Sequence, residues 1–200
     1  MEQKNSFRES VLETIRFAIV AVIIILPIRF FIVQPFIVEG SSMVPTFNDG
    51  DYLIVDEISY RFKNPERGEI IIVKSPHDGK TLIKRIVGIP GDTITKGTGS
   101  VTIRNADEMI QVLNEEAKAG TMTEIQNNRI VLSDSEYFVL GDNRTVSLDS
   151  RIFGAVTKKA VIGRPIFRLW PLSKIGAFPG ASEAEAKAVG IENENTEEER

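Results

Sequence analysis

The segment Thr81-Leu82-Ile83-Lys84-Arg85-Ile86-Val87 carries the pattern that decides the fold of this chain. Its length, its β-branched residues and the preceding turn signal Ser75-Pro76-His77-Asp78-Gly79 predict a β-strand. Side chains alternate along a strand, so Lys84 shares one face with Leu82 and Ile86, whereas Arg85 lies on the other face. Lys84 is therefore predicted to stand among aliphatic side chains on one face of a sheet.

Similar strand patterns recur at short intervals through the rest of the chain. Turn signals such as Asn48-Asp49-Gly50-Asp51 and Asn64-Pro65-Glu66-Arg67-Gly68 separate them. The strand-like segments cover 52–55, 70–73, 93–95, 101–103, 130–132, 137–140, 160–162 and 166–170. Many short strands with turns between them predict a β-rich, all-β domain, which we place at 34–178.

One short inserted helix is expected to interrupt the strands over 106–119. Asn105 suits the N-cap position, and Glu108 three residues later completes a capping box. Gly120 suits the end of the helix. Apolar residues recur between them at helical spacing, which predicts that the helix packs on the sheet: Ala106, Met109, Ile110, Leu113 and Ala117.

The composition excludes several classes of protein. The chain has 200 residues and a net charge of −4, and outside the amino terminus it carries no basic stripe that would bind nucleic acid. It contains no Cys and one His, which excludes a disulfide framework and a thiolate or histidine-rich metal site. We therefore expect no cofactor, no metal and no nucleic-acid partner.

An apolar run near the amino terminus predicts a membrane anchor. Residues 17–26 are all apolar, and the apolar character continues to Val33 with Arg29 as the one charge. A helix over 17–33 would be about 25 Å long, slightly short of the ~30 Å hydrocarbon core, but Arg16 and Arg29 can extend to the headgroups. A buried core helix and a cleaved signal peptide are the alternatives. Ten consecutive apolar residues argue against the first, and the absence of a small-x-small site directly after the run argues against the second.

The distribution of basic residues predicts the orientation of this anchor. Lys4, Arg8 and Arg16 precede the run, and after Arg29 the next basic residue is Arg61. The amino terminus, 1–16, is therefore expected in the cytoplasm and the β-domain outside. The acidic tail, 179–200, is expected to be disordered. Before it, the apolar residues are equally consistent with contact with the membrane interface and with a cap on the core: Trp170, Pro171, Leu172 and Phe178.

A candidate nucleophile follows the anchor in the stretch Gly40-Ser41-Ser42-Met43-Val44-Pro45-Thr46. A serine hydroxyl needs a base beside it to attack a carbonyl. The lone His77 adjoins Asp78 on a turn, and adjacent residues cannot orient one another as a Ser-His-Asp triad requires. Lys84 can be the base if its apolar surroundings lower its pKa by roughly 2 units or more. Alternation alone leaves open that Lys84 is a surface lysine.

The segments named above, with the polar run that follows the strand at 137–140, resemble bacterial type I signal peptidase. This family, peptidase S26, comprises membrane-anchored serine proteases that remove signal peptides. The resemblance extends from the anchor to about Trp170. The matching motifs stand in the family's order: Ser42-Met43-x-Pro45-Thr46, Gly50-Asp51-Tyr52-Leu53-Ile54-Val55, Lys84-Arg85-Ile86-Val87-Gly88-x-Pro90-Gly91-Asp92, and Gly141-Asp142-Asn143-Arg144-x-x-Ser147-x-Asp149-Ser150-Arg151-x-x-Gly154.

The resemblance implies a role for each matching residue. Ser42 corresponds to the nucleophile and Lys84 to the general base, 2.6–3.2 Å apart or slightly more. Ser147 corresponds to a serine whose hydroxyl orients the lysine. Asp149 and Arg151 correspond to a supporting ion pair.

Other positions are implied to support the site or to bind the substrate. Arg85 and Asp142 match structural positions. Some family members carry a serine where this chain has Gly40, so the oxyanion hole is expected to rely on backbone N–H groups, chiefly that of Ser42. Shallow pockets for small side chains of the substrate are expected from five apolar residues: Phe36, Val38, Met43, Leu82 and Ile83.

The resemblance implies a signal peptidase I in the bacterial plasma membrane that cleaves exported preproteins at Ala-x-Ala sites. Its partners would be signal peptides and membrane lipid, and we expect a monomer. The fold implied is a signal-peptidase-like domain of short, mostly antiparallel strands behind one transmembrane helix. Soluble Ser-Lys proteases are an alternative that the anchor disfavours. A membrane-anchored β-domain that binds exported proteins without cleaving them is the alternative from another class.

Overall fold

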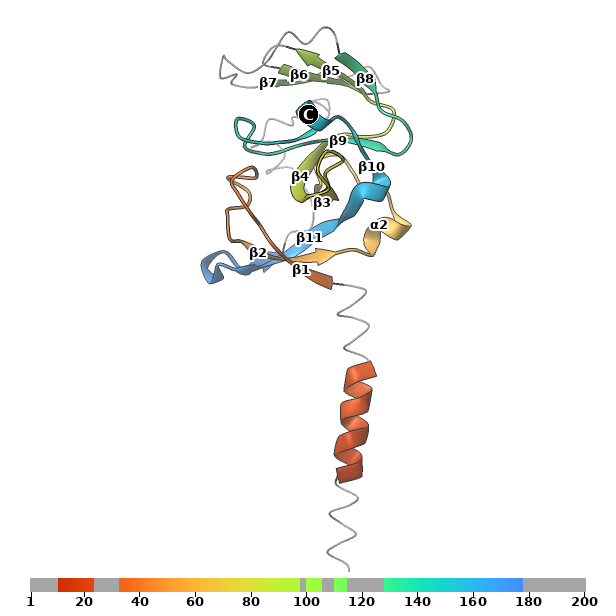
Figure 1. The fold of residues 1–200 in the computed structure, drawn as a ribbon, viewed down its shortest axis with the longest axis vertical. Coiled ribbons are helices and arrows are strands. Elements are labelled where there is room, and N and C mark those ends of the chain that lie inside the picture. The colour runs from red at the N-terminus through yellow and green to blue at the C-terminus, as the bar shows by residue number, and fades with distance from the viewer. Residues whose placement is uncertain (1–10, 24–32, 98–99, 106–109, 115–127, 178–200) are drawn as a thin grey trace, which may run out of the picture.

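The computed structural model describes residues 11–23, 33–97, 100–105, 110–114 and 128–177. Their strands form two antiparallel sheets, one above the other (Figure 1). The larger sheet has eight strands, and its strand order is β1-β2-β11-β3-β4-β9-β10, with β12 paired to β11. Its strands are β1 (Val33–Ile37), β2 (Tyr52–Asp56), β3 (Ile70–Lys74), β4 (Thr81–Gly88), β9 (Glu136–Leu140), β10 (Val156–Thr157), β11 (Val161–Trp170) and β12 (Gly176–Ala177).

Two long-range pairings place β4 and β11 in the middle of this sheet. β4 pairs with β3, which precedes it in the chain, and with β9 about fifty residues later. β11 pairs with both β2 and β3, so this carboxy-terminal strand joins β1 and β2 to the rest of the sheet. Short helical turns lie at its margins: α2 (Ser59–Phe62), α3 (Ser150–Phe153), η1 (Lys158–Ala160) and η2 (Leu172–Lys174).

The smaller sheet has the order β7-β6-β5-β8 and covers one side of the larger one (Figure 1). Its strands are β5 (Thr93–Gly97), β6 (Ser100–Arg104), β7 (Ile110–Asn114) and β8 (Asn128–Val131). One hydrophobic cluster joins the two sheets, because Ile94 and Ile103 pack with Val87, Phe138 and Leu140. Two further clusters fill the larger sheet, one around Met43 and Phe47 and the other around Ile71 and Tyr137.

The β-rich prediction is confirmed, whereas the inserted helix is wrong where the structure describes it. Residues 110–114 form strand β7, paired along its length with β6 from Ile110 opposite Arg104 to Asn114 opposite Ser100. The edge of β6 offers backbone hydrogen bonds to this segment, and its alternation of Ile110, Val112 and Asn114 with Gln111 and Leu113 suits a strand as well as a helix. The remainder of the expected helix, 106–109 and 115–119, and the proposed end at Gly120 lie outside the described residues.

A helix over 11–23 stands apart from the sheets (Figure 1). Among the described residues, no helix is both long and apolar enough to cross a bilayer. The expected span at 17–33 falls partly on 24–32, outside the described residues, and its last residue, Val33, begins strand β1. The acidic tail 179–200 and Phe178 also lie outside them.

Candidate active site

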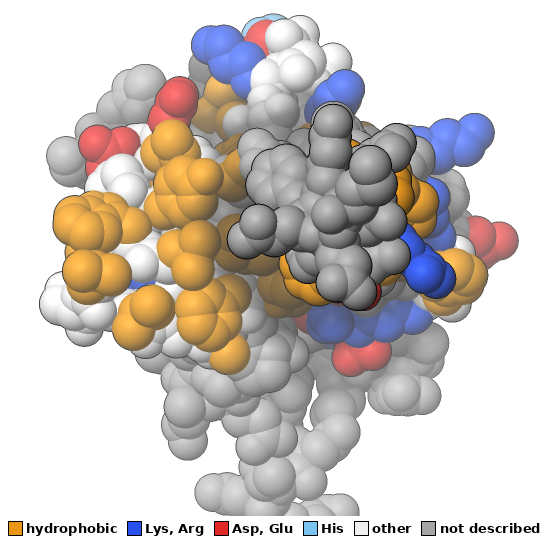
Figure 2. Space-filling model, turned by 90° about the horizontal axis from the view of Figure 1, so that it is seen from below, with side chains coloured by type: hydrophobic (Ala, Val, Ile, Leu, Met, Phe, Trp, Pro, Cys, Tyr) orange, Lys and Arg blue, Asp and Glu red, His pale blue; other side chains and the backbone are white. Residues whose placement is uncertain are grey.

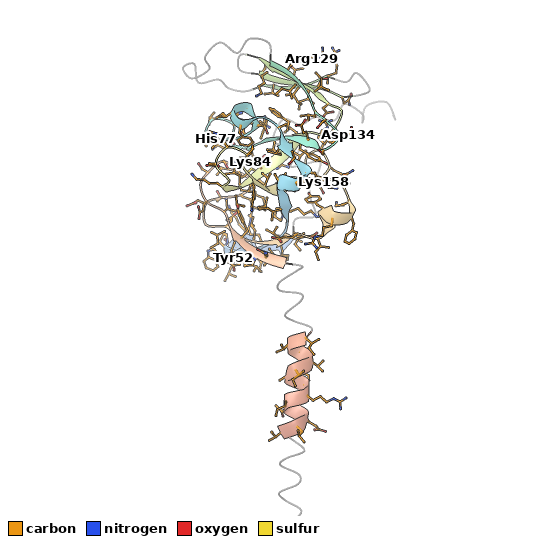
Figure 3. The ribbon with its side chains drawn as sticks, turned by 45° about the vertical axis from the view of Figure 1, so that its right-hand side comes forward. Tyr52, His77, Lys84, Arg129, Asp134 and Lys158 are labelled. Atoms are coloured by element: carbon orange, nitrogen blue, oxygen red, sulfur yellow. The ribbon has the colours of Figure 1, made fainter. Side chains whose placement is uncertain are left out.

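Ser42 and Lys84 meet at the centre of the candidate site. The Nζ atom of Lys84 lies 2.7 Å from the Oγ atom of Ser42, which confirms the separation expected from the sequence. Lys84 extends from the middle of β4 inside the β-domain, whereas His77 lies in the exposed β3–β4 turn (Figure 3). A neutral amine at 2.7 Å can accept the hydroxyl proton of Ser42, so the pair has the geometry of a nucleophile and its base.

A compact turn between β1 and β2 presents Ser42. Met43 and Phe47 anchor it in the core with no exposed surface, and the Phe47 N–H donates to the Met43 carbonyl at 2.9 Å. Gly40 enters the turn with φ = 83°, and its N–H donates to Asp49 Oδ1 at 2.7 Å. This φ lies in the left-handed region that glycine adopts without strain, which gives a physical reason for glycine rather than serine at this position.

The surroundings of Lys84 are largely apolar, as strand alternation predicts. Its cross-strand partner Ile71 and its same-face neighbours Leu82 and Ile86 pack in one hydrophobic cluster, and 2% of Lys84 is exposed. Burial lowers the pKa of Lys84 from its ordinary 10.5 to about 8. The carboxylates of Asp149 and Asp142 oppose this decrease in the pKa by stabilising the ammonium form, and the cation of Arg151 reinforces it. A substantial fraction of Lys84 is therefore neutral near pH 8.

The loop after β9 lies against this pair and is held by Asp149. The Asp149 carboxylate accepts two bonds from the Arg151 guanidinium, each 2.8 Å long, and a third at 3.1 Å from the Gly141 N–H. Asp149 is fully buried and also caps α3. The Asn143 N–H donates to the Ser42 carbonyl at 3.0 Å. The expected ion pair is thus present, and it fixes the loop that contacts the Ser42 backbone.

Ser147 is buried beside the site, but its hydroxyl does not make the expected hydrogen bond to Lys84. Its Oγ atom is enclosed and has no hydrogen-bond partner. A Cβ atom at Gly141 would collide with Ser147 Oγ and with the Ser42 carbonyl oxygen, so the absence of a side chain at Gly141 lets the loop approach the nucleophile. Ser147 is therefore close to the pair, but it makes no hydrogen bond to it in this structure.

A second buried ion pair links the base strand to the same loop. Arg85, next to Lys84 in sequence, donates from Nε and Nη2 to the two carboxylate oxygens of Asp142, each at 2.8 Å. The side chains are 0% and 1% exposed. The Thr46 hydroxyl, four residues after Ser42, donates to the same carboxylate at 2.6 Å. Asp142 therefore ties β4, the loop and the Ser42 turn together.

The five expected pocket residues fall into two groups. Val38, Met43 and Ile83 are buried in one cluster, with Phe36 partly buried against it. Leu82 is partly buried against another cluster. In the described part of the chain, no three His, Cys, Asp or Glu side chains lie close enough together to hold a metal ion.

Sequence reasoning missed Arg168. This side chain, 6% exposed, extends from β11 to the Ser42 turn, where it donates to the Thr46 carbonyl at 2.5 Å and pairs with Asp51 at 3.2 Å. The available signal was a single charge inside the apolar run Ile166-Phe167-Arg168-Leu169-Trp170.

Comparisons with known proteins show the family of this chain. The family described as "Signal peptidase, peptidase S26" matches residues 11–170. A probable signal peptidase I-2 of Synechocystis is 35% identical over 179 residues, which cover 86% of this chain and 78% of that protein. Signal peptidase I of Bacillus licheniformis is 31% identical, over 87% of this chain and 96% of its own. A crystal structure of a signal peptidase I from Enterococcus faecalis V583 is 31% identical and covers 51% of this chain and 97% of its own, with a TM-score of 0.38.

Proposed function

Because the chain belongs to the signal peptidase family, peptidase S26, we propose that it is a signal peptidase I that acts through a Ser42–Lys84 dyad. Its substrates are exported preproteins, which it cleaves after small residues at Ala-x-Ala sites. The observation that carries this proposal is the 2.7 Å contact between the Lys84 amine and the Ser42 hydroxyl. The lowered pKa of Lys84, about 8, supports it, because a lysine acts as a base only when neutral.

In each half-reaction of the proposed mechanism, Lys84 first accepts a proton and then donates it. Neutral Lys84 takes the Ser42 proton as Oγ attacks the scissile carbonyl carbon. The tetrahedral intermediate then expels the amine, which leaves with the proton from the Lys84 ammonium, and Ser42 keeps the acyl group as an ester. Lys84 next deprotonates a water molecule that attacks the ester, and it returns the proton to Ser42. Both halves need the amine within hydrogen-bond reach of Ser42 Oγ.

The supporting residues act by holding this geometry and its charge. Asp149 and Arg151 hold the loop whose Asn143 N–H contacts the Ser42 carbonyl. We assign the developing oxyanion to backbone N–H groups, chiefly that of Ser42, because Gly40 has no hydroxyl. Ser147 is buried beside Gly141 in the same loop, and we assign its hydroxyl the role of orienting the Lys84 amine.

The substrate pocket is proposed beside the turn that carries Ser42. Small apolar side chains of the signal peptide would lie against the cluster that includes Val38, Met43 and Ile83, with Phe36 at its edge. Leu82 precedes the base by two residues and would line the opposite side.

We also propose that the protein works at the bacterial plasma membrane, with 1–16 cytoplasmic, 17–33 spanning the bilayer and the β-domain outside. The large apolar side chains of the helix at 11–23 are exposed, among them Phe17 at 76%. Apolar side chains also gather on the lower face of the molecule (Figure 2). Ile37 and Trp170 each pair with Tyr52 in the sheet, and both are more than half exposed. A face of this composition suits the interfacial region of a bilayer.

The test is cleavage of a preprotein with one Ala-x-Ala site by the purified full-length protein in detergent. Mass spectrometry should find a single new amino terminus after the small residue. Ser42→Ala and Lys84→Ala should abolish the product and still fold, with a cooperative melting transition, whereas His77→Ala should cleave normally. Binding of the preprotein without cleavage by the wild type would instead support the non-catalytic alternative. Normal cleavage by Ser42→Ala would exclude the proposed nucleophile.

A further inference from the structure

Arg168 is a buried cation whose contacts lie on the segment that follows Ser42. Its Nη2 atom donates to the Thr46 carbonyl at 2.5 Å, and its Nε atom lies 3.2 Å from Asp51 Oδ2. Its guanidinium stands 4.9 Å from the ring centroid of Phe47. A buried guanidinium is costly to desolvate unless its donors are matched. Thr46, Phe47 and Asp51, which Arg168 contacts, lie on one short segment, 46–51, so Arg168 and that segment constrain each other.

The strand that carries Arg168 is itself held on both sides. Arg168 stands opposite Leu53 on β2 and opposite Gly176 on β12. Near its start, at Val161 and Gly163, β11 also pairs with β3. Because Arg168 lies on a strand that is paired on both sides, its backbone position is fixed. The planar guanidinium then fixes the direction of the hydrogen bonds that it donates. Arg168 can therefore define where the turn lies relative to the sheet.

Thr46 links Arg168, through hydrogen bonds, to the strand that carries the base. Its carbonyl accepts from Arg168, while its hydroxyl donates to Asp142, which is paired with Arg85. Arg85 is the neighbour of Lys84 on β4. The turn that carries Ser42 is thus held from one side by β11 and from the other by the strand that carries the base. Loss of the contacts on either side would let Ser42 move relative to Lys84.

We propose that Arg168 is a positioning residue that keeps the Ser42 hydroxyl within reach of Lys84, an inference that rests on the proposed Ser42–Lys84 chemistry. Arg168 holds the end of the nucleophile turn through Thr46 and Asp51, and so acts on catalysis without contact with the reacting atoms. A displacement of about 1 Å between reacting groups can cost about 10²-fold in rate. The Thr46 and Asp51 contacts of Arg168 do not involve the proposed pocket residues Val38, Met43 and Ile83, so we expect a larger loss in kcat than in KM.

The experiment compares Arg168→Met and Arg168→Lys with the wild type in detergent, with a preprotein substrate and kcat and KM measured separately. Arg168→Met should lower kcat about 10- to 100-fold, with KM changed less than about threefold. Arg168→Lys keeps a cation but lacks the fork, and it should give an intermediate kcat. If Arg168→Met fails to fold, Arg168→Lys carries the test.

The pH profile supplies a readout that a purely structural role would not move. Burial keeps the pKa of Lys84 low, and a displaced turn would admit water to the amine. The acidic limb of kcat/KM should therefore shift to higher pH in Arg168→Met. The charged groups that act on Lys84, which are Asp149, Asp142 and Arg151, are unchanged in this variant.

Arg164→Met is the matched control. Arg164 is an arginine on the same strand, paired with Asp56 at 3.5 Å and with Glu69 at 3.2 Å. Within the described part of the chain, the side-chain hydrogen bonds of Asp56 and Glu69 are made away from the nucleophile turn. It should lose stability and keep the wild-type kcat and pH profile. A wild-type kcat in folded Arg168→Met, or an equal loss in Arg164→Met, would overturn the inference. Failure of the proposed function looks different, since the wild type would then not cleave or Ser42→Ala would still do so.

Discussion

Lys84 Nζ lies 2.7 Å from Ser42 Oγ, and the lysine that makes this contact is 2% exposed. Both conditions are needed for chemistry at neutral pH. Proximity without burial would leave an ammonium that cannot accept a proton, and burial without proximity would leave a neutral amine with no hydroxyl to activate. The pairing of β3 with β4 supplies the burial, and the turn after β1 supplies the hydroxyl.

The activity should depend on pH through Lys84. Its folded-state pKa is about 8, so the neutral, active form increases as the pH rises towards 8 and is nearly complete above 9. We expect kcat/KM to fall about tenfold for each pH unit below 8, with one ionisation on the acidic limb. A profile measured between pH 5 and 10 checks this. A flat profile, or an optimum on the acidic side, would contradict the assignment of Lys84 as the base.

Replacement of Lys84 by methionine should stabilise the protein at neutral pH. The folded-state pKa of about 8 lies below the ordinary 10.5, so the unfolded chain binds more protons between these values and wild-type stability rises with pH across that window. Below pH 8 the buried ammonium costs on the order of 3 kcal/mol, which Lys84→Met removes. The Tm of Lys84→Met should exceed that of the wild type at pH 7, and the difference should shrink towards pH 10. Lys80→Met, at an exposed position, should show no such difference.

Asp149→Asn should weaken the fold and move the pH profile in a predictable direction. The variant leaves Arg151 without its buried carboxylate, a loss of about 3–5 kcal/mol in the free energy of unfolding. The Asp149 charge raises the pKa of Lys84, so its removal lowers that pKa and shifts the acidic limb of kcat/KM to lower pH. Chemical unfolding and a pH series on the folded fraction measure the two effects. Asp134→Asn is the control: it removes an exposed charge and should change neither the free energy of unfolding nor the pH profile. A shift of the acidic limb to higher pH in Asp149→Asn would contradict the predicted effect on Lys84.

Gly40→Ser should not improve the enzyme by adding an oxyanion donor. The backbone at Gly40 has φ = 83°, which a serine adopts at a cost of about 1 kcal/mol, although a Cβ atom there would meet nothing within 4 Å. The strain falls on the turn that presents Ser42, so we expect lower kcat together with a lower Tm. Gly79→Ser is the control, because Gly79 has φ = 70° in a remote exposed turn. It should lose a similar amount of stability and keep full activity; a gain of activity in Gly40→Ser would contradict the backbone assignment.

Local patterns explain both the successes and the failure of the predicted fold. Strands such as β3 and β4 were predictable because alternation and turn signals agree with their tertiary partners. The segment at 110–114 is predicted as helix because its apolar spacing fits the periods of both a helix and a strand. The hydrogen-bonding edge of β6 decides between them, and the sequence does not display that edge. The long β11 was read as two pieces because Arg164 and Pro165 interrupt its apolar pattern.

The sequence by itself determined the all-β class and the family resemblance. It also determined which residues are the candidate nucleophile and base, Ser42 and Lys84, and that the lysine lies on an apolar face. Motif order and strand alternation are local properties, so they can be read without the fold. Only the tertiary structure decided that Ser147 makes no hydrogen bond to the lysine, that Asp142 contacts both β4 and the nucleophile turn, and that Arg168 contacts the same turn. These contacts join residues as far apart as Thr46 and Arg168. The physical reason is that strand pairing, and not chain proximity, chooses which side chains share a buried space.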